Sequence, residues 1–393
     1  MTDPLTRGRL PYRQHGVGIE LEVAHGLFSA TTIDPGTRFL LRWLGQRGGF
    51  DGTSVLDIGC GYGPIGAGRG QPHADRVEAV DRDAVAVEWT TRNAIANGVA
   101  DRVTTTASLG YDDVAGDRYG LVVSNIPAKV GPAALEHLLF DASPRLAAGG
   151  EVAVVVVDGL APTVRTLLER PGVRIEAEHA NRGYLQVTYG FEAGAPGDAT
   201  PGFERGVYGR ATGEFGAAEL QWTAATVRTL PEFDTLGHGT TAAIELLAGE
   251  PPAGPVTIVG VGQGHLCLAL EGLGVRALTL VDRDLLAVRT AAANVAAAAP
   301  AAQVDCHHAA RPLVAPGSDV IVFALPEKQP VSVTAALLGA ALGGVEGDPI
   351  VVLHGRSADV SRVAELLPRH GARWVERTRR RCRAHAAAAL RRR

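Results

Sequence analysis

The chain has 393 residues, and its 38 Lys and Arg residues against 42 Asp and Glu residues give a formal net charge of −4. This length suits two or three domains, and the acidic balance argues against a globally basic nucleic-acid binder, although one local basic patch is enough to bind RNA. No apolar run reaches membrane-spanning length and the N-terminus lacks an apolar signal core, so we expect a cytoplasmic protein with no membrane partner.

The cysteines have no metal-ligand or disulfide spacing. They stand at Cys60, Cys267, Cys306 and Cys382, scattered along the chain. We therefore expect small buried hydrophobic residues, no metal site and a reducing compartment.

Strand-like and helix-like stretches alternate along the first half of the chain. Residues 18–23 alternate as a strand does, and a helix is predicted at 37–47. The elements predicted after it are strands at 55–58 and 77–81, a helix at 84–96, a strand at 121–124, a helix at 133–146, a strand at 151–157, a helix at 162–169, and strands at 173–178 and 184–189.

The second half repeats the first. Gly260 and Asp282 each lie 201 residues after Gly59 and Asp81. The matching elements are a vague lead-in at 217–229, helices at 241–247, 285–297, 331–342 and 360–367, and strands at 256–259, 278–282, 320–323 and 350–353. Such a repeat predicts two α/β domains of the Rossmann-like type with mostly parallel sheets, at residues 1–191 and 203–393, joined by a linker rich in Gly, Pro and Ala at 192–202.

The arginine-rich C-terminus allows two interpretations. Residues 377–393 resemble an RNA-binding tail. Alternatively, residues 373–389 form the closing hairpin of the second domain, matching residues 174–189, and only the last three arginines are tail-like.

Residues 55–66 read Val-Leu-Asp-Ile-Gly-Cys-Gly-Tyr-Gly-Pro-Ile-Gly, a strand followed by a glycine-rich turn. Glycines let the backbone pass close to a ligand, and Asp81 at the tip of the next strand is placed to bind ribose hydroxyls. Asp57 lies inside the first strand, where it would repel a pyrophosphate. A ligand with positive charge, such as the amino group of S-adenosylmethionine, suits it better than a dinucleotide.

A third buried strand ends in Ser124-Asn125-Ile126-Pro127. The amide oxygen of Asn125 can accept a hydrogen bond from a substrate amine. The simpler interpretation is that Asn125 is a turn residue at a strand end, where asparagine is common.

Val55–Gly66, Leu121–Lys129 and the lead-in at 26–41 resemble the "methyltransferase small" domain of bacterial ribosomal RNA guanine-N2 methyltransferases. The resemblance spans roughly residues 18–190 and implies a class I S-adenosylmethionine-dependent methyltransferase. With the motifs above it predicts Asn125 and Pro127 as catalytic residues and Phe28 and Lys129 as substrate residues. The predicted cofactor-binding residues are Asp57, Gly59, Cys60, Gly61, Gly63, Asp81, Arg82, Ser108 and Asn125.

The chain departs from this family at its amine-methylating motif. The family has Asn-Pro-Pro followed by an aromatic residue, whereas this chain has Asn125-Ile126-Pro127-Ala128. An aromatic side chain that stacks on a flipped base contributes roughly 1–3 kcal/mol. Tyr111 or Phe28 is the candidate replacement.

The second copy keeps the glycines and acids at Gly260, Gly262, Gly264, Asp282 and Asp284, but has Ile258 in place of Asp57 and Ala324 in place of Asn125. We therefore expect a degenerate domain that orients substrate, with Arg356, Arg377, Arg379, Arg380 and Arg381 contacting phosphates. Relatives of this type place the degenerate copy first, so the order here is reversed.

The predicted function is S-adenosylmethionine-dependent N-methylation of the exocyclic amine of guanine in ribosomal RNA. The predicted partner is ribosomal RNA or a ribosomal subunit, and we expect a monomer. Two alternatives stay open: a methyltransferase for a small molecule or a protein side chain, and a non-catalytic RNA-binding scaffold of the same fold. The retention of Asp57, Asp81 and Asn125 argues against the scaffold.

Overall fold

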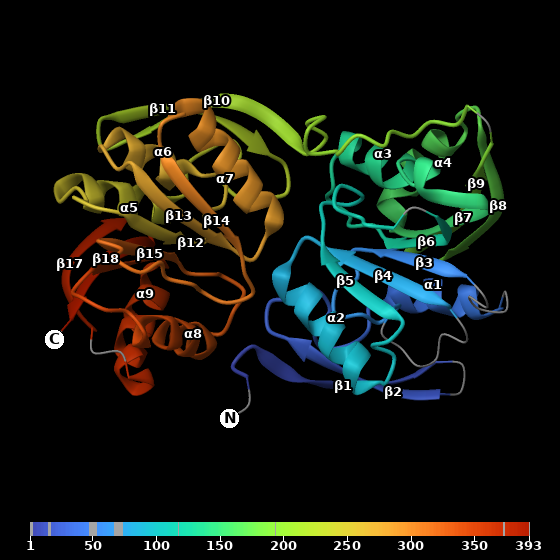
Figure 1. The fold of residues 1–393 in the computed structure, drawn as a ribbon, viewed down its shortest axis with the longest axis horizontal. Coiled ribbons are helices and arrows are strands. Elements are labelled where there is room, and N and C mark those ends of the chain that lie inside the picture. The colour runs from blue at the N-terminus through green and yellow to red at the C-terminus, as the bar shows by residue number, and fades with distance from the viewer. Residues whose placement is uncertain are drawn as a thin grey trace. The chain divides into compact units, whose positions relative to one another are not determined.

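The computed structural model describes residues 3–14, 17–46, 53–66, 74–116, 118–192, 194–371 and 374–392. The chain divides into two compact units (Figure 1). The first unit is Thr6–Tyr208, and the second is Gly209–Arg393 together with Met1–Leu5. The first unit thus extends beyond the predicted boundary at 202/203, because the segment after Phe191 packs on it.

The first unit begins with an antiparallel hairpin and continues as an α/β sheet. Its strands are β1 (Thr6–Gln14), β2 (Val17–Ala24), β3 (Ser54–Ile58), β4 (Arg76–Asp81), β5 (Val103–Ala107), β6 (Tyr119–Asn125), β7 (Leu146–Val157), β8 (Val173–Asn181) and β9 (Tyr184–Phe191). Its helices are α1 (Pro35–Gln46), α2 (Ala84–Ala96), α3 (Pro132–Phe140), α4 (Ala161–Leu168) and the 3-10 turns η1 (Ser143–Arg145) and η2 (Asp158–Leu160).

The sheet of the first unit has the strand order β5-β4-β3-β6-β7-β9-β8, parallel except at β9. Alternate residues of its buried strands supply two apolar clusters, one on each face. Leu40, Leu44 and Val55 belong to the cluster under α1 and α2, and Leu56 and Leu139 to the cluster under α3 and α4. The strand order runs outward in one direction from β3 and in the other direction from β6. The carboxyl ends of these two neighbouring strands therefore form the crevice where ligands bind in open α/β sheets.

The second unit repeats this architecture. Its strands are β10 (Gly209–Ala217), β11 (Leu220–Val227), β12 (Val256–Val259), β13 (Ala277–Asp282), β14 (Gln303–His308), β15 (Val320–Ala324), β16 (Ile350–Arg356), β17 (Trp374–Cys382) and β18 (His385–Arg392). Its helices are α5 (His238–Gly249), α6 (His265–Gly272), α7 (Leu285–Ala298), α8 (Val331–Gly343), α9 (Ser357–Leu366) and the 3-10 turn η3 (Leu367–His370). The sheet order is β14-β13-β12-β15-β16-β18-β17, which confirms the predicted pair of tandem Rossmann-like α/β folds.

Several predicted elements differ from those observed. Helix α3 ends at Phe140 rather than at residue 146, because Asp141 caps it and Pro144, which has no N–H, starts a 3-10 turn. The predicted strand at 18–23 is β2, but its hairpin partner β1 was not predicted. The predicted helix end at Arg47 lies outside the described residues.

The C-terminal arginines form a hairpin. β17 and β18 pair in antiparallel register, and Arg391 and Arg392 belong to β18. The tail interpretation is therefore wrong for these two residues, while Arg373 and Arg393 lie outside the described part of the chain. The arginines of β17 pair with buried alanines of β18, with Arg379 opposite Ala388 and Arg381 opposite Ala386, so the charge lies on the edge strand of the sheet.

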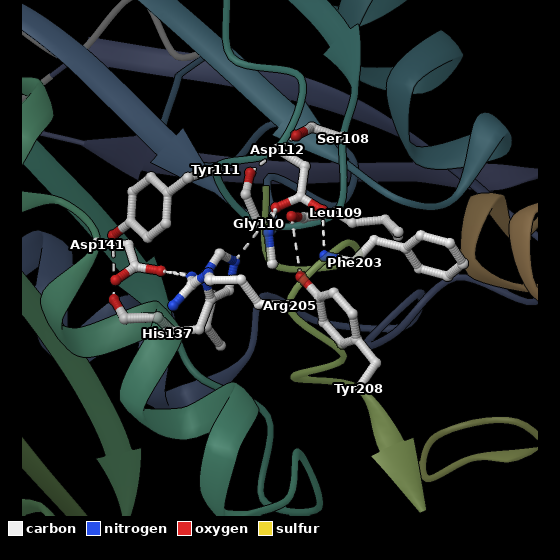
Figure 2. A network of polar contacts seen from close by, with 12 residues as sticks. Ser108, Leu109, Gly110, Tyr111, Asp112, His137, Asp141, Phe203, Arg205 and Tyr208 are labelled. Atoms are coloured by element: carbon white, nitrogen blue, oxygen red, sulfur yellow. Dashed lines mark hydrogen bonds and ion pairs between the residues drawn. The ribbon is translucent and has the colours of Figure 1, made fainter. Parts of the chain in front are cut away.

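The segment between the two sheets is anchored to the first unit (Figure 2). The main-chain N–H groups of Gly202 and Phe203 donate to Asp112 over 2.5 and 2.9 Å, and the Tyr208 hydroxyl donates to the Leu109 carbonyl over 2.9 Å. Arg205 pairs with Asp141, which is 3% exposed and also lies 2.5 Å from His137 Nδ1. We call residues 198–208 the strap, since they hold the loop that follows β5.

The described residues include no helix long and apolar enough to cross a membrane. Within the same ranges no group of three or more His, Cys, Asp or Glu side chains is placed to hold a metal ion. Cys60 and Cys267 are buried as predicted, but Cys306 is exposed on β14, where it contradicts the expectation of a buried hydrophobe.

Candidate active site

The glycine turn after β3 presents bare backbone at the carboxyl edge of the sheet. Gly59, Gly61 and Gly63 have φ angles of 76°, 61° and 85°, which favour glycine. A Cβ atom built on Gly59 or Gly61 would meet nothing within 4 Å. The turn therefore leaves room for a ligand against its main chain.

Asp81 ends β4 beside this turn and is partly exposed. One carboxylate oxygen accepts the Gly61 N–H over 3.0 Å, and the other accepts the Asp83 N–H over 2.9 Å. Desolvation and the nearby Asp83 carboxylate raise the pKa of Asp81 to about 6. Its remaining lone pairs can accept the two hydroxyl groups of a ribose.

Asp57 is a buried carboxylate whose hydrogen-bonding capacity is not satisfied by its neighbours. Its side chain is 1% exposed, and neither oxygen forms a well-aligned hydrogen bond with the described residues, although the nearby Gly66 main-chain N–H lowers its pKa somewhat. Burial, and secondarily the Asp81 carboxylate, raise the pKa of Asp57 to about 7. A buried carboxylate without a donor is unstable unless a cation completes it, and the ammonium group of S-adenosylmethionine is such a cation.

Three other predicted cofactor residues have side chains that are already engaged. Cys60 is buried and its thiol accepts from Thr90 Oγ1 over 3.4 Å. Ser108 donates its hydroxyl to the Gly110 carbonyl and accepts the Asp113 N–H, so it shapes the loop after β5. Arg82 follows Asp81 and is partly exposed.

Asn125 has an orientation that its neighbours determine. Its Nδ2 lies 2.8 Å from Asp34 Oδ2 and 3.0 Å from Thr37 Oγ1. An ionised carboxylate only accepts hydrogen bonds, so the NH2 group must face Asp34. Oδ1 of Asn125 is left as an acceptor, with no donor among the described residues, on a side chain that is partly exposed.

The residues around Asn125 divide into exposed and buried sets. Pro127, Ala128 and Lys129 are exposed on the turn after β6. Phe28 is 75% exposed, and its segment is tied to the site where Ser29 and Thr32 accept the Tyr62 hydroxyl over 3.4 and 3.5 Å.

Tyr111 is 2% exposed and donates to the Leu138 carbonyl, so it cannot stack on a base. Phe28 is therefore the only one of the two proposed replacements whose ring is accessible.

Two residues of this site were missed at the level of sequence. Asp34 caps α1 by accepting the Thr37 N–H over 3.0 Å, with Pro35 at the first helical position. The Asp-Pro pair was a visible helix start, but its contact with Asn125 spans 91 residues. Asn93 on α2 binds both the main chain of Glu22 and the carbonyl of Tyr62, each over 2.8 Å, and so joins β2 to the glycine turn.

The equivalent edge of the second unit keeps the turn but not the chemistry. Asp282 accepts the Gly262 and Asp284 N–H groups over 3.4 and 3.0 Å. Ile258 is fully buried where the first unit has Asp57. A Cβ atom on Gly260 would lie 2.9 Å from Ala324 Cβ, so the space over this glycine is filled.

The first half of the chain is similar to known methyltransferases. A model of the methyltransferase small domain matches residues 18–184. A ribosomal RNA small subunit methyltransferase C of Chromohalobacter salexigens is 40% identical over 162 residues, which cover 39% of this chain and 46% of that protein. A ribosomal protein L11 methyltransferase of Methylococcus capsulatus is 31% identical over 166 residues, covering 41% of this chain and 53% of that protein. The chain thus spans about half the length of these curated relatives.

A solved structure resembles the whole chain. The 16S rRNA N2 G1207 methyltransferase of T. Thermophilus, in complex with AdoMet and guanosine, covers 100% of both chains with a TM-score of 0.68 and 18% sequence identity. At this low identity, the structural match establishes a shared fold and nothing more. The tandem sheets of the present chain therefore have a counterpart in a known structure.

The parallel strands of the open sheet, the glycine turn and the acids of β3 and β4 all lie within the segment that matches the methyltransferase small domain. The match to this family covers residues 18–184 of the 393 residues in the chain.

Proposed function

We propose that this protein is an S-adenosylmethionine-dependent N-methyltransferase that acts on the exocyclic amine of guanine in ribosomal RNA. The observation that carries the proposal is the fixed amide of Asn125, whose NH2 group is bound by Asp34 and Thr37 and whose oxygen is left to accept. Methyltransferase C relatives and the fold neighbour support the choice of ribosomal RNA. We place the activity in the cytoplasm, where ribosomal RNA is found.

The cofactor fits the carboxyl edge of the first sheet. S-adenosylmethionine supplies an electrophilic methyl group on a sulfonium. Asp57 would bind the ammonium group of the cofactor, and Asp81 would bind its ribose hydroxyls. The main chain of the turn from Gly59 to Gly63 would pack against the cofactor. These residues would hold the cofactor at the same edge of the sheet as Asn125, which ends β6.

Asn125 acts on the acceptor nitrogen. An exocyclic amine is conjugated with its ring and is poorly nucleophilic, so its hydrogens must be bound as the nitrogen becomes tetrahedral. Asn125 Oδ1 accepts one hydrogen, and a main-chain carbonyl near Ile126 or Pro127 accepts the other. These hydrogen bonds strengthen as charge develops on the nitrogen, so they stabilise the transition state more than the bound substrate.

The exposed ring of Phe28 is our candidate for stacking on the target base, and Lys129 is the candidate for contact with a nearby phosphate. The second unit, which lacks counterparts of Asp57 and Asn125, would contribute to substrate orientation.

Methyl transfer from radiolabelled S-adenosylmethionine tests the proposal. The full-length protein is incubated with deproteinised ribosomal RNA, with intact small and large ribosomal subunits, and with a small-molecule extract. We expect label in one of the RNA-containing samples, released by nuclease digestion as N2-methylguanosine. Cofactor binding without transfer to any of them, by a folded protein, would instead identify a scaffold.

A second candidate is a methyltransferase for a protein side chain or a small molecule. Ala128 favours it, because the family places an aromatic residue there for a base. The similarity to a ribosomal protein L11 methyltransferase also favours a protein substrate. Label that survives nuclease treatment and moves with ribosomal protein, or label confined to the extract, would select this candidate.

A further inference from the structure

A basic groove lies outside the site described above, on the first unit between β1 and α1. Its volume is about 470 Å3, and its lining includes Tyr12 and Arg13 from β1 and Arg38, Leu41, Arg42 and Gln46 from α1. These residues take no part in the proposed methyl transfer. Three of them are arginines, in a chain whose net charge is negative.

Arg38 and Arg42 are both exposed and stand one helical turn apart. Within the described ranges neither side chain forms an ion pair. Like charges at this spacing on a helix repel each other and destabilise the helix slightly. An anionic ligand would remove this cost, because it would be shared between the two guanidinium groups.

The groove begins next to the catalytic asparagine. Arg38 directly follows Thr37, whose hydroxyl accepts from Asn125 Nδ2 over 3.0 Å. The positive charge of Arg38 also reaches this region, since it lowers the pKa of Tyr62, which burial and Asp34 otherwise raise. From Arg38 the groove follows α1 toward Gln46, away from the carboxyl edge of the sheet.

We propose that this groove binds the phosphodiester backbone of the RNA substrate beside the target nucleotide, with Arg38 and Arg42 each contacting a phosphate. The inference rests on the proposed function for its ligand. Guanidinium groups suit phosphate oxygens because their donors form a planar fork. Tyr12 lines the same groove and adds a hydroxyl donor for a ribose or phosphate oxygen. The catalytic unit would then hold RNA itself, in addition to any contact with arginines of the second unit.

The test compares two pairs of substitutions in the full-length protein. The first is Arg38→Gln with Arg42→Gln. The control is Arg76→Gln with Arg118→Gln, two exposed arginines at the amino ends of β4 and β6, at the opposite edge of the sheet. The probe is a fluorescein-labelled single-stranded RNA of twelve nucleotides, uridine with one central guanosine, measured by anisotropy at several salt concentrations. S-adenosylmethionine affinity and the thermal midpoint are measured in parallel.

We expect the Arg38 and Arg42 pair to weaken RNA binding roughly tenfold or more at low salt. The slope of log affinity against log salt should become shallower by about 1.4, which corresponds to two lost phosphate contacts in single strands. Cofactor affinity and the thermal midpoint should not fall. The control pair should change the slope by much less.

Four results would overturn the inference or separate it from the proposed function. RNA affinity and slope that are unchanged in the Arg38 and Arg42 variant, in a protein that methylates RNA, would refute the groove and leave the function intact. An equal loss in the control variant would also refute the groove. Loss of RNA binding in the Arg38 and Arg42 variant, in a protein that methylates no RNA, would support the groove and refute the proposed methylation. Preference for an acidic peptide over the RNA would refute both.

Discussion

The two units have the same architecture, but their described residues differ at the carboxyl ends of the central strands. Both have the same strand order and a hairpin before the sheet. Asn93 and Asn294 each join that hairpin to the glycine turn, and Asn294 does so through Ala225 and Gln263 over 2.8 and 2.9 Å. At the ends of the central strands the units differ, with Asp57 and Asn125 in one and Ile258 and Ala324 in the other.

This comparison separates residues that hold the fold from residues that serve a ligand. Asp282 makes the same two main-chain hydrogen bonds as Asp81, so an acid at this position has a structural use without any cofactor. Asp57 lacks such a pair of main-chain hydrogen bonds among the described residues, and its burial raises its pKa even though the Gly66 main chain opposes the shift. Retention of a residue that only destabilises the empty fold is the clearer sign of function.

The largest expected effect is on stability, from Asp57. The folded protein keeps a proton on Asp57 up to pH about 7, whereas an unfolded Asp has an ordinary pKa of 3.8. Stability therefore falls as the pH rises from about 4 to 7, and the full loss, at most about 4 kcal/mol, is present above pH 7. Asp57→Asn should stabilise β3 at pH 8 and not at pH 4, as measured by amide hydrogen exchange, and should weaken cofactor binding.

The mirror substitution sharpens the result. Ile258→Asp places a carboxylate in the same buried position of the second sheet and should lower the protection of β12 at pH 8 by a similar amount. If Asp57→Asn has the same protection as the native protein at both pH values, then Asp57 is not a source of stored instability.

The next largest effect is on catalysis. Asn125→Ala removes the acceptor for the substrate amine and should lower kcat by roughly 10²–10³-fold, with nearly unchanged cofactor affinity. Single-turnover methylation and calorimetry measure the two quantities. Ala324→Asn in the second unit should alter neither. Equal losses of kcat and cofactor affinity in Asn125→Ala would make Asn125 a cofactor-binding residue instead.

Cofactor affinity gives the third comparison. Asp81→Ala should weaken S-adenosylmethionine binding by about 2–3 kcal/mol, because it removes charge-assisted hydrogen bonds to the ribose. Asp282→Ala loses the same pair of main-chain bonds but should leave cofactor binding unchanged, with one equivalent bound per chain. Two equivalents per chain, or the same loss in both variants, would show that the second unit also binds cofactor.

The smallest effect concerns the strap at residues 198–208, for which the second unit has no described counterpart. Arg205→Ala leaves the buried Asp141 with His137 and the Asp198 main-chain N–H as its partners and should destabilise the first unit by about 1–2 kcal/mol. Exchange of the amides at 108–113 should accelerate. Arg210→Ala breaks an exposed pair with Asp234 and should change stability by less than about 0.5 kcal/mol. Equal effects would mean that the strap adds no rigidity.

The sequence predicts most of the carboxyl edge because its signals are local. The turn from Gly59 to Gly63 and Asp81 follow apolar strands directly, and an Asp cap starts the alanine-rich helix α2 where it was expected. The arginines of β17 resembled a tail because a charged edge strand has no local sequence signal that shows it pairs with a neighbour.

Contacts between distant segments were beyond this reading. Asp34 reaches Asn125 across 91 residues and Asn93 reaches Glu22 across 71, and neither pair has a periodic pattern. Ser108 was predicted as a cofactor-binding residue, but its hydroxyl is used inside its own loop. The sequence thus identified the region of the candidate site. The packing of the folded chain was needed to show which polar atoms are still available to bind a ligand.

The strap also sets an order of events during synthesis. The last strand of the first sheet ends at Phe191, yet the residues that hold the loop after β5 extend to Tyr208. Because a nascent chain folds from its N-terminus as it emerges, the sheet can form before the strap binds the loop that follows β5. A ribosome that stalls between these two points would therefore display a folded sheet whose cofactor edge is still unfinished.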